Sequence, residues 1–426
     1  MSFSSAEDEF LLECVKFANE NHLDNFSEVI TTSFKPVNAD QVHILESHGN
    51  ISSDWSKVLV EEADSETLNR IRRCTFSGFI IISLLTGAID EIDGAVLPSG
   101  LFDTFFAGKC FISRSCRISS TSIVSNVFLG FGAGIINCGS VTCDIPICES
   151  LSITVGPETG GRCVRVSAGM NFVTICEQIF RGKASVGVSD NRKGLQTNYS
   201  VIGNCTTIFK CDKVRNSYIG PKCRISSSNL DCCTLSSSAA NPIVVSAGAR
   251  LSHCIMNEST SASNGCLAEF LYMSENSSIG DCARISHCVL GPDSSVAGGE
   301  CHSSLLGPFV GFHHQSLLIA SVWPQGRGNI AYGAKIGANH TGRVSDQECF
   351  PGEGIFFGLG SSIKFPSNLL ESPYSIVAPG TVLPPQKLSF PFSLISICDR
   401  HLTKSSSANT LSPGWVIASN PYLIER

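Results

Sequence analysis

Aliphatic residues recur at every sixth position along much of the chain, often followed by glycine and with a small residue four places later. The stretches 219–225 and 279–285 show this pattern almost without error. Further in-phase sets are Ile112, Ile118 and Val124; Leu129 and Ile135, with Ala133 in the small position; Ile202, Ile208 and Val214; Leu290 and Val296; and Ile330 and Ile336, with Ala334 in the small position. Each such hexad makes one short strand and a turn, and three make a triangular coil of about 18 residues. The pattern therefore predicts a mainly β fold, a left-handed parallel β-helix of hexapeptide repeats.

The N-terminal part follows a different pattern. Residues 4–22 place Phe10, Leu11, Val15 and Phe17 at near-helical spacing, and residues 40–48 show a second brief helical pattern. Residues 1–72 are therefore expected to form an α-rich N-terminal cap. From residue 73 the pattern favours strands, which predicts a β-helix with loop insertions over 73–400 and a C-terminal tail over 401–426.

Within the β-helix, we expect regular coils over residues 100–385 with interruptions near 150–200 and 235–270, where the hexads fade. The run 374–384 (YSIVAPGTVLP) resembles the closing coil of hexapeptide acyltransferases. Residues 389–397 (SFPFSLISI) follow it and could cover the last coil, which otherwise exposes unpaired strand edges.

Composition agrees with short strands and tight turns, since 42% of the 426 residues are hydrophobic and only 16% are charged. The 21 cysteines include no CxxC pair, which argues against common zinc motifs. Cys116 and Cys223 fall where a hexad requires a small residue. We therefore interpret the cysteines as small buried hydrophobic residues.

The formal net charge is −7 and no Lys/Arg run occurs, so nucleic acid is not an expected partner. The acidic N-terminal sequence lacks the features of a signal peptide. The longest apolar run, residues 78–89, is too short to span a bilayer and predicts a buried strand. We expect a cytoplasmic protein without a membrane partner.

Polar and aromatic residues concentrate between Leu306 and Asn368. The polar side chains of this segment are His313, His314, Gln315, Arg327, Asn339, His340, Arg343, Asp346, Glu353, Lys364 and Asn368. Crowding polar groups on a β-helix wall is costly unless they find partners or a ligand. The segment is therefore the predicted functional site.

The same segment resembles an uncharacterised family of bacterial and protist hexapeptide-repeat proteins. The resemblance lies in GPFVGFHHQSLLIA at 307–320, NHTGR at 339–343, and PGEGIFFGLG at 351–360 followed by IKFPSN at 363–368. It extends over most of residues 40–400 and implies the fold and the place of the site, without naming a reaction. Its relation in fold to the trimeric hexapeptide acyltransferases implies a homotrimer.

The leading functional hypothesis is acyl transfer to a sugar or a nucleotide-sugar, with acyl-CoA as co-substrate and no permanently bound cofactor. His314 or His340 would be the general base, and Asn339 would orient the base or the substrate. The residues predicted to bind substrate are His313, Gln315, Arg327, Arg343, Asp346, Glu353, Lys364 and Asn368. Among these, Arg343 and Lys364 would hold a phosphate. Because successive strand residues face opposite sides, at most one of His313 and His314 should face a given cleft.

Two alternatives remain open. Three histidines could meet at a zinc ion across a trimer interface, although their spacing differs from that of β-helix carbonic anhydrases. The chain could also be a non-catalytic sugar-nucleotide-binding or assembly module, in which VGPETGGR at 155–162 forms either an anion-binding turn or an ordinary one. Asp103, Asp212 and Glu300 show no pairing that would suggest glycoside hydrolysis.

Overall fold

The computed structural model describes residues 34–61, 65–92, 95–148, 150–157, 161–181, 196–337, 347–399 and 408–425. By contacts the chain divides into two units: unit 1 comprises residues 1–148 and 195–248, and unit 2 comprises residues 149–194 and 249–426. The helix predicted over residues 4–22 lies outside the described residues. The division of the chain at residues 73 and 401 stays a prediction.

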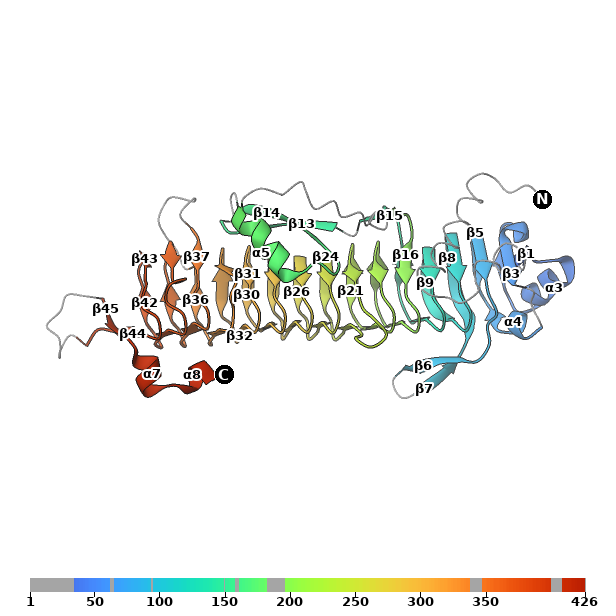
Figure 1. Cartoon of the computed structure of the whole chain (residues 1–426). Helices are drawn as coiled ribbons and strands as arrows, with labels where there is room; N and C mark the ends of the chain where they lie inside the picture. Colours follow the sequence, from blue (N-terminus) through green and yellow to red (C-terminus); the bar gives the residue numbers. More distant parts are fainter. Residues whose placement is uncertain are drawn as a thin grey trace. The chain divides into compact units, whose positions relative to one another are not determined.

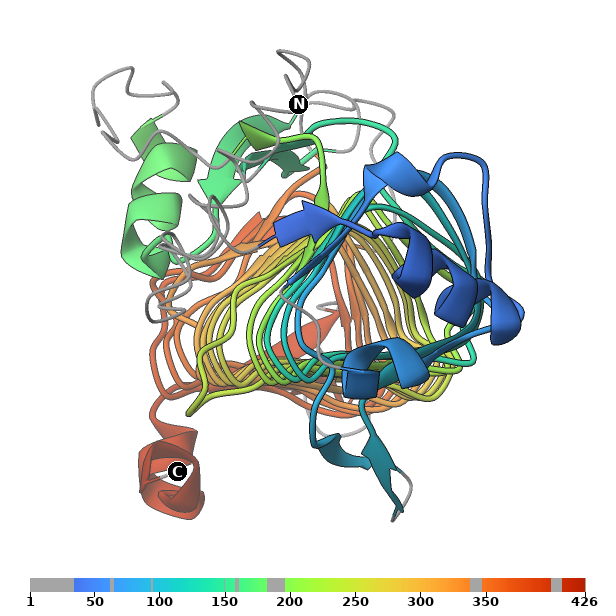
Figure 2. The ribbon, with the colours of Figure 1, turned by 90° about the vertical axis from the view of Figure 1, so that its right-hand side faces the viewer.

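Both units are parallel β-solenoids, in which each coil pairs with the next (Figure 1). In unit 1, Ile118, Ile135, Ile208 and Ile225 stack in register on four successive coils. All four side chains are buried, as the aliphatic repeat predicted. Viewed along the stack, the coils enclose a three-sided core (Figure 2). The predicted mainly β, parallel solenoid is thereby confirmed.

The repeat length differs slightly from three hexapeptides. Arg250, Leu267 and Arg284 of unit 2 occupy the same place in successive coils and are 17 residues apart. The corners are tight, and many corner residues other than glycine adopt positive φ, such as Ser120 at 50° and Asn137 at 54°. Short polar residues tolerate this left-handed conformation better than β-branched ones do.

The described part of unit 1 begins with short strands and helices. These are β1 (Phe34–Pro36), α3 (Ala39–Ser47), β2 (Ile51–Ser52), η1 (Trp55–Lys57), β3 (Val58–Glu61), α4 (Ser65–Asn69) and β4 (Ile71–Arg72). Of these, β2, β3 and β4 pair in parallel with the coil strands that follow and so belong to the solenoid. The helix expected over residues 40–48 corresponds to α3, whose N-cap Asn38 and Gln41 form a reciprocal capping box. The apolar run at 78–89 supplies the buried end of β5 (Thr75–Ile82), as predicted.

The coil strands of unit 1 follow in order. They are β8 (Gly100–Ile112), β9 (Arg117–Leu129), β10 (Gly134–Ile136), β11 (Ser140–Thr142), β16 (Ser200–Ile202), β17 (Thr207–Phe209), β18 (Lys213–Arg215), β19 (Tyr218–Ile219), β20 (Arg224–Ser226), β21 (Asn229–Asp231), β22 (Thr234–Leu235) and β23 (Val244–Val245). Two antiparallel pairs accompany them, the hairpin β6 (Ala88–Ile92) with β7 (Ala95–Pro98), and β12 (Ile147–Cys148) with β15 (Gln196–Thr197). The hairpin leaves the coil wall between β5 and β8 (Figure 2).

The chain leaves the coils of unit 1 after β11 and resumes them at β16, since β10 pairs with β17 and β11 with β18. The predicted interruption near 150–200 is thereby confirmed. Its central part belongs to unit 2 and consists of β13 (Ser150–Val155), β14 (Arg162–Ser167) and α5 (Phe172–Arg181). We call these three elements the insertion. Its buried side packs on Ile255, Tyr272, Val289, Leu305 and Val322 of the unit 2 coils.

The coils of unit 2 comprise β24 (Arg250–Met256), β25 (Ser261–Ala262), β26 (Leu267–Met273), β27 (Ser278–Gly280), β28 (Arg284–Leu290), β29 (Ser295–Ala297), β30 (Glu300–His302), β31 (Leu305–Leu306), β32 (Gly311–His313), β33 (Leu317–Ile319), β34 (Val322–Trp323), β35 (Asn329–Ile330), β36 (Lys335–Ile336), β37 (Cys349–Phe350), β38 (Phe356–Phe357), β39 (Ser362–Ile363), β40 (Ser367–Asn368), β41 (Ile376–Val377), β42 (Val382–Leu383), β43 (Gln386–Lys387) and β44 (Leu394–Ile397). The interruption predicted near 235–270 is wrong for residues 250–270, because β24 and β26 pair in regular register. Small buried residues such as Cys254 and Ala262 replace the expected aliphatic ones there.

Unit 2 ends with β45 (Asn409–Ser412), which pairs antiparallel with β44, and with α7 (Trp415–Ser419) and α8 (Tyr422–Glu425). None of the helices that the structure describes has the length and apolar character needed to cross a bilayer. No disulfide joins the described cysteines, and most of them are buried. Burial raises the pKa of the Cys116 thiol to about 12, which fits a packing role.

Candidate functional site

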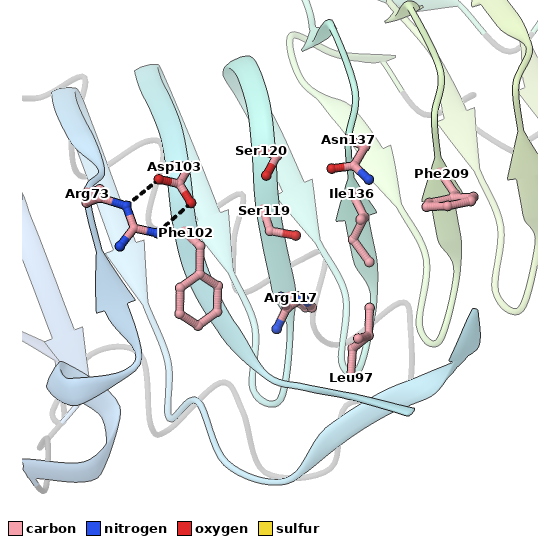
Figure 3. Close-up of a pocket in the computed structure, with 10 residues that line it drawn as sticks. All are labelled: Arg73, Leu97, Phe102, Asp103, Arg117, Ser119, Ser120, Ile136, Asn137 and Phe209. Atoms are coloured by element: carbon pink, nitrogen blue, oxygen red, sulfur yellow. Dashed lines mark hydrogen bonds and ion pairs between the residues drawn. The ribbon is translucent and has the colours of Figure 1, made fainter. Parts of the chain in front are cut away.

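A pocket of about 390 Å³ lies in unit 1 between the β6–β7 hairpin and the outward side of the coils (Figure 3). We call it the hairpin pocket. Its lining residues are Arg73, Leu97, Phe102, Asp103, Arg117, Ser119, Ser120, Ile136, Asn137 and Phe209. Its volume lies in the range usual for small-molecule sites, about 300–1,000 Å³.

The floor of the hairpin pocket is one row of outward side chains on successive coils. Phe102, Ser119, Ile136 and Phe209 are aligned by the register of β8, β9, β10 and β17. They face outward because each follows an aliphatic residue that points into the core. Leu97 of the hairpin packs with Ile136 and Phe209, so the floor is largely apolar.

The rim of the hairpin pocket is the adjoining row of corner residues, Arg73, Asp103, Ser120 and Asn137, all with φ between 50° and 54° (Figure 3). Arg73 and Asp103 form a two-pronged ion pair, with Nε–Oδ1 at 2.5 Å and Nη2–Oδ2 at 2.9 Å. The hydrogen bond from Arg73 lowers the pKa of Asp103 below its usual value. The rim therefore carries one neutralised charge pair.

Arg117 supplies a second cation to the hairpin pocket. Its guanidinium carbon lies 4.8 Å from the centroid of the Phe102 ring, and Nη1 donates a hydrogen bond to the carbonyl oxygen of Pro98 at 2.6 Å. Its Nε is buried without a hydrogen-bond partner, and burial lowers the pKa of the guanidinium. No carboxylate among the described side chains pairs with Arg117. The pocket thus combines an apolar floor with a cation for which the described side chains offer no carboxylate partner.

The predicted site residues that are described lie in unit 2. His313 ends β32, and His314 and Gln315 follow at a corner, each with φ of 53°. The rings of His313 and His314 are 5.7 Å apart and tilted by 39°. The expectation that the two histidines face opposite sides is wrong, because the positive φ at His314 ends the strand alternation.

Arg327 and Glu353 lie together at a different corner, the one that precedes β32 and β35. Arg327 Nε is 3.4 Å from Glu353 Oε1, and the Tyr374 hydroxyl donates to the same oxygen at 3.0 Å. Arg327 also lies over the Phe309 ring, at 5.4 Å. These contacts already satisfy the pair, which argues for a structural role.

The other predicted residues divide into two groups. Lys364 follows β39, and its backbone N–H pairs with the carbonyl of Leu383, while Asn368 lies in β40 and accepts a hydrogen bond from the Leu370 N–H at 3.1 Å. Asn339, His340, Arg343 and Asp346 lie outside the described residues. Within the described part of the chain, no three His, Cys, Asp or Glu side chains are placed to hold a metal ion.

The structure brings together a serine, a histidine and a glutamate in unit 2 that the sequence did not single out as a group. Ser286 Oγ lies 2.7 Å from His302 Nδ1, and His302 Nε2 lies 3.8 Å from Glu300 Oε2. A neighbouring row of corner side chains stacks His253, Phe270 and His287. The recurrence of aromatic rings every 17 residues was the sequence signal for this row.

Comparison with known proteins identifies a family and one relative. Residues 34–345 match the family described as "Domain of unknown function (DUF4954)". The chain belongs to this family. A protein of Treponema pallidum (strain Nichols), described as uncharacterized, is 26% identical over 426 residues, covering 92% of this chain and 56% of the relative. The chain thus spans a little over half the length of this relative.

The family match bears on the sites. It contains every residue of the hairpin pocket and also Ser286, Glu300 and His302, whereas Glu353, Lys364 and Asn368 fall beyond its end. The expectation of a family of unknown function with a bacterial relative is confirmed. The family description names no reaction.

Proposed function

We propose that this protein binds an anionic sugar derivative, a sugar phosphate or nucleotide-sugar, in the hairpin pocket. The observation that carries the proposal is Arg117, a partly buried cation without a described counter-ion and with its Nε unsatisfied. A buried unpaired charge is costly, and an anion that pairs with it offsets that cost. A guanidinium also matches the geometry of phosphate oxygens.

The remaining lining residues suit the rest of such a ligand. Phe209, Ile136 and Leu97 offer an apolar surface for a nucleobase or the apolar side of a sugar ring. Ser119 and Asn137 offer hydroxyl and amide groups for sugar hydroxyls. These features support the class of non-catalytic nucleotide-sugar binders as well as that of enzymes.

The experiment is a titration calorimetry series with the full chain and UDP-N-acetylglucosamine, inorganic phosphate and uncharged N-acetylglucosamine as probes. Binding of the nucleotide-sugar is expected, and Arg117→Gln should weaken it about 10- to 100-fold, since hydrogen bonds to charged groups contribute roughly 1.5–3 kcal/mol. Asp103→Asn should strengthen binding, because it frees the Arg73 guanidinium.

Arg224→Gln is the matched control. Arg224 occupies the coil position of Arg117 on a later coil, is exposed, and does not line the pocket. If no probe binds, or if Arg117→Gln and Arg224→Gln behave alike, the proposed ligand class is wrong.

The second candidate function is acyl transfer from acyl-CoA by a left-handed hexapeptide-repeat homotrimer in the cytoplasm. The parallel coils and their positive-φ corners support this class. The exposed His314 beside His313 favours a histidine base, with His340 and Asn339 as the further sequence candidates.

Mass spectrometry of acetyl transfer from acetyl-CoA to a panel of amino sugars tests the second candidate. Loss of transfer in His314→Gln or His340→Gln is the expected result, with His43→Gln in α3 as control. If the intact chain acetylates no acceptor, acyl transfer to sugars is refuted, and sedimentation as a monomer would refute the trimer.

A further inference from the structure

We propose that Ser286, His302 and Glu300 form an acyl-transfer site on the outward side of the unit 2 coils, with Ser286 as the nucleophile. The inference takes from the acyl-transfer candidate only the acyl donor, a phosphate-bearing thioester. It assigns the chemistry to residues other than His314 and His340. It is independent of the hairpin pocket.

The register of two coil strands holds the three side chains on one side of the wall. In the parallel pair β28–β30, Ser286 is aligned with His302 and Arg284 with Glu300. Ile285 and Cys301 lie between them in sequence and are buried in the core, so the outward direction of their neighbours is fixed. Sites built on strands hold their geometry better than sites on loops do.

The contacts have the order nucleophile, base, carboxylate. Ser286 Oγ is 2.7 Å from His302 Nδ1, within hydrogen-bond reach of a general base. His302 Nε2 is 3.8 Å from Glu300 Oε2, within ion-pair range but longer than a hydrogen bond. The proposed reaction uses the tautomer with the proton on Nε2. That tautomer leaves the Nδ1 lone pair free to accept the serine proton. The arrangement follows the logic of serine hydrolases with the two imidazole nitrogens exchanged.

The site is accessible. The His302 side chain is 27% exposed and that of Glu300 is 53% exposed, and Ser286 is half-buried. Next to Ser286, the corner ring of His287 stacks on Phe270 at 4.9 Å, and Phe270 stacks on His253 at 4.8 Å. This aromatic row offers an apolar edge to an acyl group, and the exposed Arg284 offers a cation to a donor phosphate.

The reaction has two balanced steps. Ser286 Oγ attacks the thioester carbonyl, His302 takes the hydroxyl proton, the C–S bond breaks, and the proton passes to the leaving thiolate, which departs as a thiol. In the second step water or a sugar hydroxyl attacks the acyl-serine, His302 takes its proton, and the proton returns to Ser286 as the C–O bond breaks. No oxidant or metal ion is consumed. Glu300 acts through His302 and is a positioning residue.

The experiment uses the full chain with p-nitrophenyl acetate, with acetyl-CoA and with a fluorophosphonate probe, followed by peptide mass spectrometry. We expect acetyl and phosphonyl adducts on Ser286, and a loss of ester hydrolysis of at least 100-fold in Ser286→Ala and His302→Gln, the size usual for removing a nucleophile or base. Glu300→Gln should lower kcat about 10-fold or more with little change in KM, and Glu300→Asp should restore part of it.

Ser252→Ala is the matched control. Ser252 occupies the coil position of Ser286 two coils earlier, and its Oγ lies 3.0 Å from His253 Nδ1. Since Ser252 lies outside the proposed triad, its loss should leave labelling and hydrolysis unchanged. Ser286→Cys, which keeps a nucleophile, should retain acylation and guards against a folding defect in Ser286→Ala.

The outcomes separate the proposals. If the folded wild type shows no Ser286 adduct and no ester hydrolysis, or if Ser252→Ala and Ser286→Ala are alike, the inference is overturned. Acetyl transfer to a sugar that persists in Ser286→Ala overturns the inference while the acyl-transfer candidate stands. Ser286-dependent hydrolysis without transfer to any sugar supports the inference and refutes the sugar acceptor.

Discussion

Tyr272 of β26 links the insertion to the coils of unit 2. Removing its hydroxyl should therefore lower the local stability of the insertion and leave the rest of the unit unchanged. The side chain is fully buried in the apolar cluster shared by the insertion and the coils. Its hydroxyl donates a hydrogen bond to the carbonyl oxygen of Met170 at 2.6 Å. Tyr272→Phe keeps the ring and leaves that carbonyl without its donor. Such a loss costs about 1–2 kcal/mol, which corresponds to about 5- to 30-fold more frequent local opening.

Hydrogen exchange measured by mass spectrometry is the assay, because stability differs between parts of one solenoid. Amides of β13, β14 and α5 should exchange about 5- to 30-fold faster in Tyr272→Phe, while those of β32, β33 and β36 keep the wild-type rate. Tyr272→Ala also removes the ring and should cost about 3–5 kcal/mol. Tyr332→Phe is the control, since that side chain is 53% exposed. Unchanged exchange of the insertion, or equal acceleration throughout unit 2, would refute the reasoning.

Three further predictions concern unit 1. Arg114→Met should destabilise the unit by about 2–3 kcal/mol in thermal unfolding, because it leaves the buried Glu61 carboxylate without its cation. Adding Glu61→Gln to the same chain should restore part of the lost stability. Gly78→Ala should abolish soluble folding, since its φ is +154° and a Cβ would lie 2.0 Å from a backbone oxygen of β8; normal melting would contradict this. Arg73 lowers the pKa of Asp103 in the folded protein below the unfolded value of about 3.8. The ion pair therefore stabilises the fold fully above pH 3.8, and this stabilisation is lost as the pH falls through the lower pKa of the folded protein. The melting difference between wild type and Asp103→Asn should therefore shrink in acid, and a difference that grows there would contradict the pairing.

The solenoid could be predicted because its buried aliphatic residues recur at a regular spacing in the sequence. Ile118, Ile135, Ile208 and Ile225 each mark one coil, and the fading of the hexads near residues 150–200 predicted the interruption that holds the insertion. The regular coils at 250–270 were missed because Cys254 and Ala262 fill the core there. A rule that seeks large aliphatic residues overlooks such positions, although the next coil holds Leu271 and Ile279 in the same places.

The sites could be predicted much less well, because outward positions carry no hydrophobic periodicity. The sequence shows Asp103 only as one of three carboxylates without a paired carboxylate, and its ion-pair partner Arg73 is 30 residues earlier. Phe209 lines the same pocket but follows the insertion in the sequence. The local density of polar residues predicted the site at residues 306–368 instead. His302 and Ser286 become neighbours only once the register of β28 and β30 is known.

Because of the insertion, the two units differ in when during synthesis their apolar surfaces can be covered. Unit 1 is complete when residue 248 has been made, although the chain has already produced the insertion within it. The coil residues that cover the apolar side of the insertion, from Ile255 to Val322, are made afterwards. A growing chain therefore carries an uncovered apolar segment for at least that stretch of translation, a state in which chains tend to aggregate or need chaperones. Completion of unit 2 is what ends this exposure.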